Sequence, residues 1–226
     1  MCDAEAWTHQ ARDLGSLTTI DIFDPGMRDS LGGMAEALLA GAPAHFALAG
    51  HSMGGRIALE VMRRAPDRVT RLALMDTNYL PRSPEEGGDR EAGNRYALLD
   101  IAHSQGVRAM AARWVQGMVH PERLEDADLI ESIIGMMARK SAKTFAAQIH
   151  ALLQRPDATP VLSQIQCPTL VLCGRQDSWS VLARHEEMAA LIPRSRHIVV
   201  EHCGHMSTME RPEVVTAAMR NWLTSS

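Results

Sequence analysis

HFALAGHSMGG, residues 45–55, decides how this sequence is interpreted. The apolar run at residues 45–49 leads directly into the pattern Gly-x-Ser-x-Gly at residues 50–54, and helical periodicity then runs over residues 54–64. Between a strand and a helix this pattern is typical of a nucleophile elbow, a sharp turn that exposes the serine hydroxyl above a sheet. We therefore expect Ser52 to be a nucleophile, the alternative being an ordinary turn serine.

A nucleophilic serine needs a general base and a carboxylate. It is a weak nucleophile near neutral pH, so a base must remove its proton and a carboxylate must orient that base. Asp177 follows a predicted strand at residues 169–173, and His205 follows one at residues 197–200. Because parallel strands end at one edge of a sheet, both side chains should lie near Ser52. We expect His205 to be the general base and Asp177 the acid that orients it.

Other residues compete for these roles. Asp76 ends a predicted strand and is the rival acid, whereas Asp177 could merely cap a turn. His202 is the competing base, and His205 could be a surface turn histidine. We interpret His51 as a neighbour of the nucleophile without a catalytic role.

Strands and helices alternate over most of the chain. Apolar runs predict strands at residues 17–23, 45–49, 69–75, 169–173 and 197–200. Helical periodicity predicts helices after the N-caps Asp3 and Ser30, and at residues 54–64, 181–191 and 212–223. Such alternation favours an α/β fold with a mostly parallel sheet flanked by helices.

The predicted secondary structure changes between residues 81 and 160. Strands disappear there, and amphipathic helical stretches follow, among them residues 107–119, 129–138 and 144–153. We interpret residues 81–160 as an inserted helical cap, and residues 1–80 with 161–226 as the core. Trp114 and Met118 could line a substrate pocket under this cap, although buried packing explains them as well.

Composition excludes several classes of protein. The chain has 226 residues, of which 46% are hydrophobic and 22% charged, enough to bury a full core. Its 23 basic and 27 acidic residues are scattered, and no basic run suits nucleic acid. No window approaches the roughly 18 consecutive apolar residues of a membrane span. We expect no nucleic-acid or membrane partner; whether the chain forms a homodimer stays open.

Neither cofactor nor metal is expected. The four cysteines lack the spacing of a disulfide framework or a zinc site, which favours a reducing, cytoplasmic location. His185-Glu186-Glu187 lacks the second histidine of the zinc-protease motif, and no phosphate-cradling glycine loop occurs.

Four motifs in this order resemble the α/β-hydrolase superfamily, in its branch of small capped bacterial esterases, thioesterases and carbon–carbon bond hydrolases. They are LAGHSMGG (residues 48–55), RAPDRV (64–69), PTLVLCGRQD (168–177), and GH with MERPE (204–205 and 209–213). The resemblance implies hydrolysis of a small-molecule ester or thioester through an acyl-enzyme on Ser52. It also implies that the Met53 N–H helps to bind the oxyanion. The same triad would serve carbon–carbon bond hydrolysis or lyase chemistry.

The start of the chain departs from the family pattern. Members begin with two or three strands and a His-Gly or Pro-Gly loop, whereas here a helix is predicted from Asp3. By the resemblance, the missing third strand would lie between residues 17–23 and 45–49, leaving a gap inside the sheet. We therefore expect an N-terminally truncated chain whose second oxyanion donor is Met1, Cys2 or a residue before them. A catalytically impaired binding or scaffold protein is the alternative that this departure raises.

Overall fold

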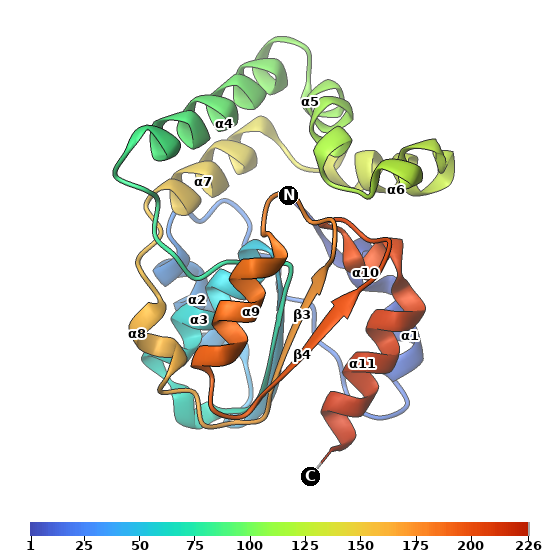
Figure 1. Ribbon diagram of the computed structural model, residues 1–226. Helices are drawn as coiled ribbons and strands as arrows, with labels where there is room; N and C mark the ends of the chain where they lie inside the picture. The colour runs from blue at the N-terminus through green and yellow to red at the C-terminus, as the bar shows by residue number, and fades with distance from the viewer. Residues whose placement is uncertain (226) are drawn as a thin grey trace.

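A parallel four-stranded sheet forms the centre of the molecule (Figure 1), in the computed structural model that describes residues 1–225. The strands are β1 (Phe46–His51), β2 (Val69–Met75), β3 (Thr169–Gly174) and β4 (Ser195–Val200), and they lie in the order β1-β2-β3-β4. All neighbouring pairs are parallel, as the alternation with helices predicted. Every residue of β3 is buried, as expected for an inner strand covered on both faces.

Helices cover both faces of this sheet (Figure 1). On one side lie α2 (Leu31–Gly41), α3 (Met53–Arg64), α8 (Thr159–Leu162) and α9 (Leu182–Leu191); on the other lie α1 (Thr8–Leu14), α10 (Ser207–Glu210) and α11 (Pro212–Thr224). Short 3-10 turns, η1 (Ala4–Trp7) and η2 (Pro66–Arg68), precede α1 and β2. The predicted N-caps are confirmed, because Asp3 accepts a hydrogen bond from the Glu5 N–H and Ser30 accepts one from the Gly33 N–H.

The predicted strand at residues 17–23 is wrong. This segment is irregular, and its large side chains Leu17, Ile20 and Ile22 are 37–45% exposed. A strand needs a partner for its backbone groups, and within residues 1–225 nothing pairs with this segment. The expected gap inside the sheet is therefore also wrong: β1 is an edge strand of an uninterrupted ladder.

Residues 81–160 form helices that lie across the carboxyl ends of the strands (Figure 1). They are α4 (Glu86–Ser104), α5 (Val107–Trp114), η3 (Val115–Gly117), η4 (Pro121–Glu125), α6 (Ala127–Ala138) and α7 (Ala142–Leu153). Their apolar side chains share one cluster with Met1, Ala6 and Met206, so this layer also packs on the chain start and on the turn before α10. The division into a core and a cap remains our proposal.

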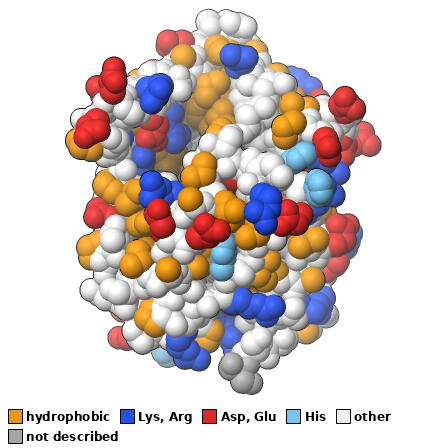
Figure 2. All heavy atoms as spheres, viewed as in Figure 1, with side chains coloured by type: hydrophobic (Ala, Val, Ile, Leu, Met, Phe, Trp, Pro, Cys, Tyr) orange, Lys and Arg blue, Asp and Glu red, His pale blue; other side chains and the backbone are white. Residues whose placement is uncertain are grey.

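Acidic and basic side chains are interspersed on the face drawn in Figure 2. Within the described chain, no helix combines the length and the apolar character needed to cross a lipid bilayer.

Candidate active site

Ser52 lies at a strained turn between β1 and α3. Its φ of 54° and ψ of −117° are uncommon for a residue with a side chain, and the Ser52 N–H donates to the Met75 carbonyl at 2.9 Å. A Cβ on Gly50 would collide with the backbone of Gly54, so the turn requires glycine there. The sharp strand-to-helix turn that a nucleophile elbow requires is therefore present, with the Ser52 hydroxyl at the carboxyl edge of the sheet.

The three residues predicted to act together are joined by two hydrogen bonds. His205 Nε2 lies 2.8 Å from Ser52 Oγ, and His205 Nδ1 lies 2.8 Å from Asp177 Oδ2. An ionised carboxylate can only accept, so Nδ1 carries the proton and Nε2 is free to accept the Ser52 hydroxyl proton. His205 and Asp177 are each 3% exposed, which keeps water away from the bond between them.

Both ends of the buried pair are shifted toward their charged forms. Burial alone would lower the pKa of His205, but the charge and hydrogen bond of Asp177 outweigh it and raise that pKa above its ordinary value. Burial alone would raise the pKa of Asp177, yet His205 and the N–H groups of Ser180 and Trp179 lower it. The site therefore stabilises an imidazolium beside a carboxylate, the state that forms when His205 accepts a proton.

The comparison with known proteins decides the family. A sequence model described as alpha/beta hydrolase fold matches residues 34–212, most of the chain and all three of these residues. The chain belongs to the α/β-hydrolase fold family.

Several similar members of this α/β-hydrolase family are named as esterases or hydrolases. The chain is 27% identical over 189 residues to a pimeloyl-[acyl-carrier protein] methyl ester esterase of Nitrosomonas europaea, covering 82% of this chain and 74% of that protein. It is 30% identical over 185 residues to an (E)-2-((N-methylformamido)methylene)succinate hydrolase of Acinetobacter baylyi, covering 79% and 65%. A solved structure, a thermophilic esterase from Thermogutta terrifontis, superposes with a TM-score of 0.85 at 29% identity, covering 98% and 85%. The protein is an α/β-fold hydrolase.

In this α/β-hydrolase the rival acid and base lie elsewhere. Asp76 is fully buried; its Oδ1 accepts from the Gly174 N–H at 2.9 Å and its Oδ2 accepts from the Ser207 hydroxyl. His51 Nε2 lies 3.4 Å from Asp76 and donates to the His205 carbonyl at 2.7 Å. Asp76 and His51 thus hold the backbone around His205 and do not contact its ring nitrogens. The His202 ring packs edge-on against His120 instead of facing Ser52.

Glu210 is a positioning residue that sequence reasoning missed. Its buried carboxylate accepts from the N–H groups of Gly204 and Met206, on either side of His205, at 3.0–3.1 Å. It also accepts from the His120 N–H at 2.8 Å, in the segment that leads into η4. One side chain therefore ties the turn that carries His205 to the helical layer above it. In the sequence, Glu210 stands out only as part of the MERPE motif, and that motif indicates no role for its side chain.

Replacing Glu210 by glutamine should loosen this turn. The variant presents an NH₂ group where a second acceptor oxygen is needed, so at least one buried N–H loses its partner at a cost of about 1–3 kcal/mol. We expect a lower urea midpoint and a kcat that falls more than KM changes. Urea unfolding and ester kinetics measure the two. Glu213→Gln, three residues further along in the first turn of α11 and exposed, is the matched control and should behave like the parent; equal effects of both variants would contradict the role.

Aromatic rings connect the helical layer to the acid and base loops. The Trp179 ring lies 4.9 Å from the His205 ring, and Trp114 stacks on Trp179 at 5.4 Å with 21° between the planes. Phe145 packs against Trp114 at 5.1 Å, and the Ser178 hydroxyl donates to the Gly117 carbonyl at 3.2 Å. These contacts form an apolar wall beside the imidazole.

The oxyanion site is defined on one side only. Met53 is the first residue of α3, so its N–H is among those without a partner inside the helix. The amino group of Met1 donates to Gln148 Oε1 at 2.5 Å, on α7. Among residues 1–225 no hydrogen bond joins Met1 or Cys2 to Ser52. The expectation that one of them supplies the second donor stays a prediction.

Proposed function

We propose that this hydrolase cleaves a small-molecule carboxylic ester or thioester through an acyl-enzyme on Ser52. The observation that carries the proposal is the unbroken pair of 2.8 Å contacts from Ser52 through His205 to Asp177. The similarity to the Nitrosomonas and Thermogutta proteins, both esterases, supports cleavage of the same class of bond.

The proposed reaction has two halves. His205 Nε2 takes the Ser52 proton while the serine oxygen attacks the carbonyl carbon, and Asp177 stabilises the imidazolium that results. The Met53 N–H stabilises the oxyanion at the positive end of α3. His205 then returns its proton to the leaving alcohol or thiol, whose bond to the carbonyl breaks. Water, activated by the same imidazole, releases the acid in the second half.

Hydrolysis of p-nitrophenyl acetate and butyrate tests the proposal. An acyl-enzyme predicts a burst of p-nitrophenol close to one equivalent per active site when deacylation is slower than acylation, followed by steady turnover. Steady turnover without a burst is compatible with an acyl-enzyme only if an acyl group can be trapped on Ser52. Release no faster than with heat-denatured protein would favour the scaffold alternative.

The pH dependence of this reaction follows from the raised pKa of His205. The base must be neutral to accept the Ser52 proton, so activity rises with pH as His205 loses its proton and falls about tenfold for each pH unit below its pKa. Because that pKa lies above the ordinary 6.5, we expect the rising limb of log kcat/KM to be centred above pH 6.5. A stopped-assay profile from pH 5 to 9 measures it. A rising limb centred below pH 6.5 would contradict the assigned geometry.

A further inference from the structure

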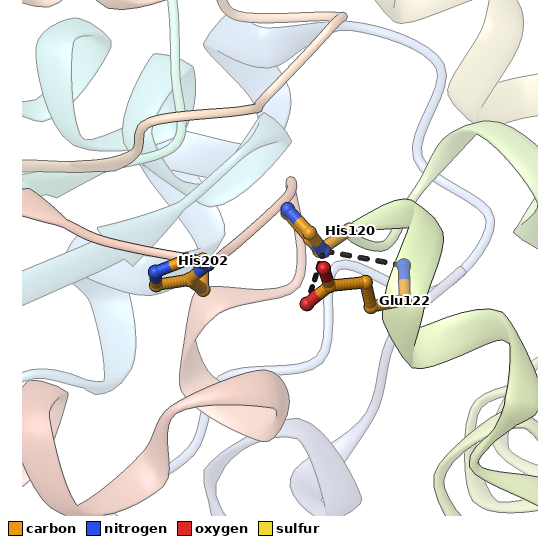
Figure 3. Close-up of side chains that lie close together, drawn as sticks. All are labelled: His120, Glu122 and His202. Carbon is orange, nitrogen blue, oxygen red and sulfur yellow. Dashed lines mark hydrogen bonds and ion pairs between the residues drawn. The ribbon is translucent and has the colours of Figure 1, made fainter.

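Two histidines and a glutamate, which the proposed reaction does not use, lie close together (Figure 3). His120 is the N-cap of η4, Glu122 is in its first turn, and His202 is in the turn after β4, three residues before His205. One ligand atom of each lies within 4.8 Å of the other two. The spacing along the chain does not show this group, because its third member is 80 residues away and joins only in the fold.

The geometry of the group suits a small divalent cation. Zn²⁺ bonds of about 2.0–2.2 Å in tetrahedral arrangement place two ligand atoms about 3.4 Å apart. His120 Nδ1 and Glu122 Oε2 are already 3.9 Å apart. The Glu122 side chain is 77% exposed and His202 is also exposed, so both can move the remaining distance by side-chain rotation.

His120 is the fixed member of the group. It is buried, and its backbone N–H donates to the Glu210 carboxylate. Its ring Nδ1 accepts from the Glu122 N–H at 3.2 Å, so in the neutral tautomer the Nδ1 lone pair faces Glu122 and Nε2 carries the proton. A cation would replace the Glu122 N–H as the partner of this lone pair, with the Glu122 carboxylate 3.9 Å from Nδ1.

The types of donor select the metal. Two imidazoles and one carboxylate suit Zn²⁺, Ni²⁺, Co²⁺ or Cu²⁺, whereas Mg²⁺ and Ca²⁺ prefer oxygen ligands alone. Three protein ligands on an exposed surface leave at least one position for water.

We propose that His120, Glu122 and His202 form a binding site for a first-row divalent transition-metal ion, with Zn²⁺ as its representative. The ion would join two chain segments that are already in contact. The His205 N–H donates to the Met118 carbonyl at 2.7 Å, and a Cβ on Gly204 would lie 2.6 Å from the Val119 carbonyl carbon. Bound metal therefore adds a side-chain bridge to a backbone contact, holding the helical layer against the turn that carries His205.

Isothermal titration of the whole protein with ZnCl₂ at pH 7.5, with MgCl₂ as the matched metal, tests the site. We expect saturable 1:1 Zn²⁺ binding, no Mg²⁺ binding, and a Tm that rises with Zn²⁺ concentration, because the three ligands come together only in the folded chain. Glu122→Ala and His202→Ala should each weaken Zn²⁺ binding by about tenfold or more, since loss even of outer groups costs about 10–100-fold.

The control and the fold are checked in the same experiment. His103→Ala removes an exposed histidine at the end of α4, outside the group, and should bind Zn²⁺ like the parent. Glu122→Ala changes an exposed side chain and should keep the parent Tm without metal, which separates loss of a ligand from loss of folding. Absence of 1:1 binding, or equal affinity in the parent, Glu122→Ala and His202→Ala, would overturn the proposal.

Discussion

Ser52→Ala is expected to lower kcat for p-nitrophenyl butyrate by about 10⁴–10⁶-fold, the scale on which serine hydrolases lose rate without their nucleophile. The reason is chemical: alanine leaves His205 Nε2 without a hydroxyl to deprotonate, so no acyl-enzyme can form. The backbone turn should persist, since alanine carries the same Cβ at φ 54° as serine does. We therefore expect little change in Tm. Steady-state kinetics and thermal unfolding of the same preparation measure both quantities.

Ser104→Ala is the control for this variant. Ser104 is exposed at the end of α4, and its hydroxyl bonds only to the Asp100 carbonyl within the same helix. Its removal should leave kcat within about twofold of the parent value, because substitutions on the exposed surface, away from the core and from buried hydrogen-bond networks, have small effects. If Ser52→Ala kept more than a tenth of the parent kcat, Ser52 could not be the nucleophile.

Asp177→Asn is expected to lower kcat by about 10⁴-fold, by reversing the tautomer of His205. The Trp179 and Ser180 N–H groups both donate to Asp177 Oδ1, so the carbonyl oxygen of the asparagine should stay there. Its NH₂ group then faces His205 Nδ1 and forces that nitrogen to accept. The ring proton then sits on Nε2. That nitrogen faces the Ser52 hydroxyl as a donor and can no longer accept the hydroxyl proton.

Asp76→Asn provides the comparison, because Asp76 is the rival acid. Its carboxylate bonds to the Gly174 N–H and the Ser207 hydroxyl and lies beside His51, so it supports the backbone around His205 without bonding to the imidazole. We expect this variant to lose stability more than kcat, in contrast to Asp177→Asn. Urea unfolding beside kcat for both variants tells them apart. A larger fall in kcat from Asp76→Asn than from Asp177→Asn would reverse the assignment.

Sequence reasoning succeeded where the determinants are local or repeated. The nucleophile elbow needs only a strand, two glycines and a helix, all within residues 45–64, and Ser52 is found there. Asp177 and His205 each follow a strand of a parallel sheet, so the topology alone brings them to the edge near Ser52.

Sequence reasoning failed where contacts between segments far apart in the chain determine the structure. Residues 17–23 have strand-like composition but no strand to pair with. The helix α4 buries little of its own surface, Gly88 and Ala102 being its buried residues, so its periodicity is weak and it was not among the helices named from the sequence. The bond from the His120 N–H to Glu210 and the contact of His120 with His202 join segments 80 or more residues apart, which no spacing rule can show.

Covalent capture of Ser52 tests the central claim most directly. The protein is incubated with an alkyl fluorophosphonate, its intact mass is measured, and the modified residue is located by peptide mass spectrometry, with Ser52→Ala and Asp177→Asn in parallel. We expect one phosphonyl group per chain on Ser52, no labelling of Ser52→Ala, and much slower labelling of Asp177→Asn. Label on another residue, or an active esterase that stays unlabelled at Ser52, would contradict it.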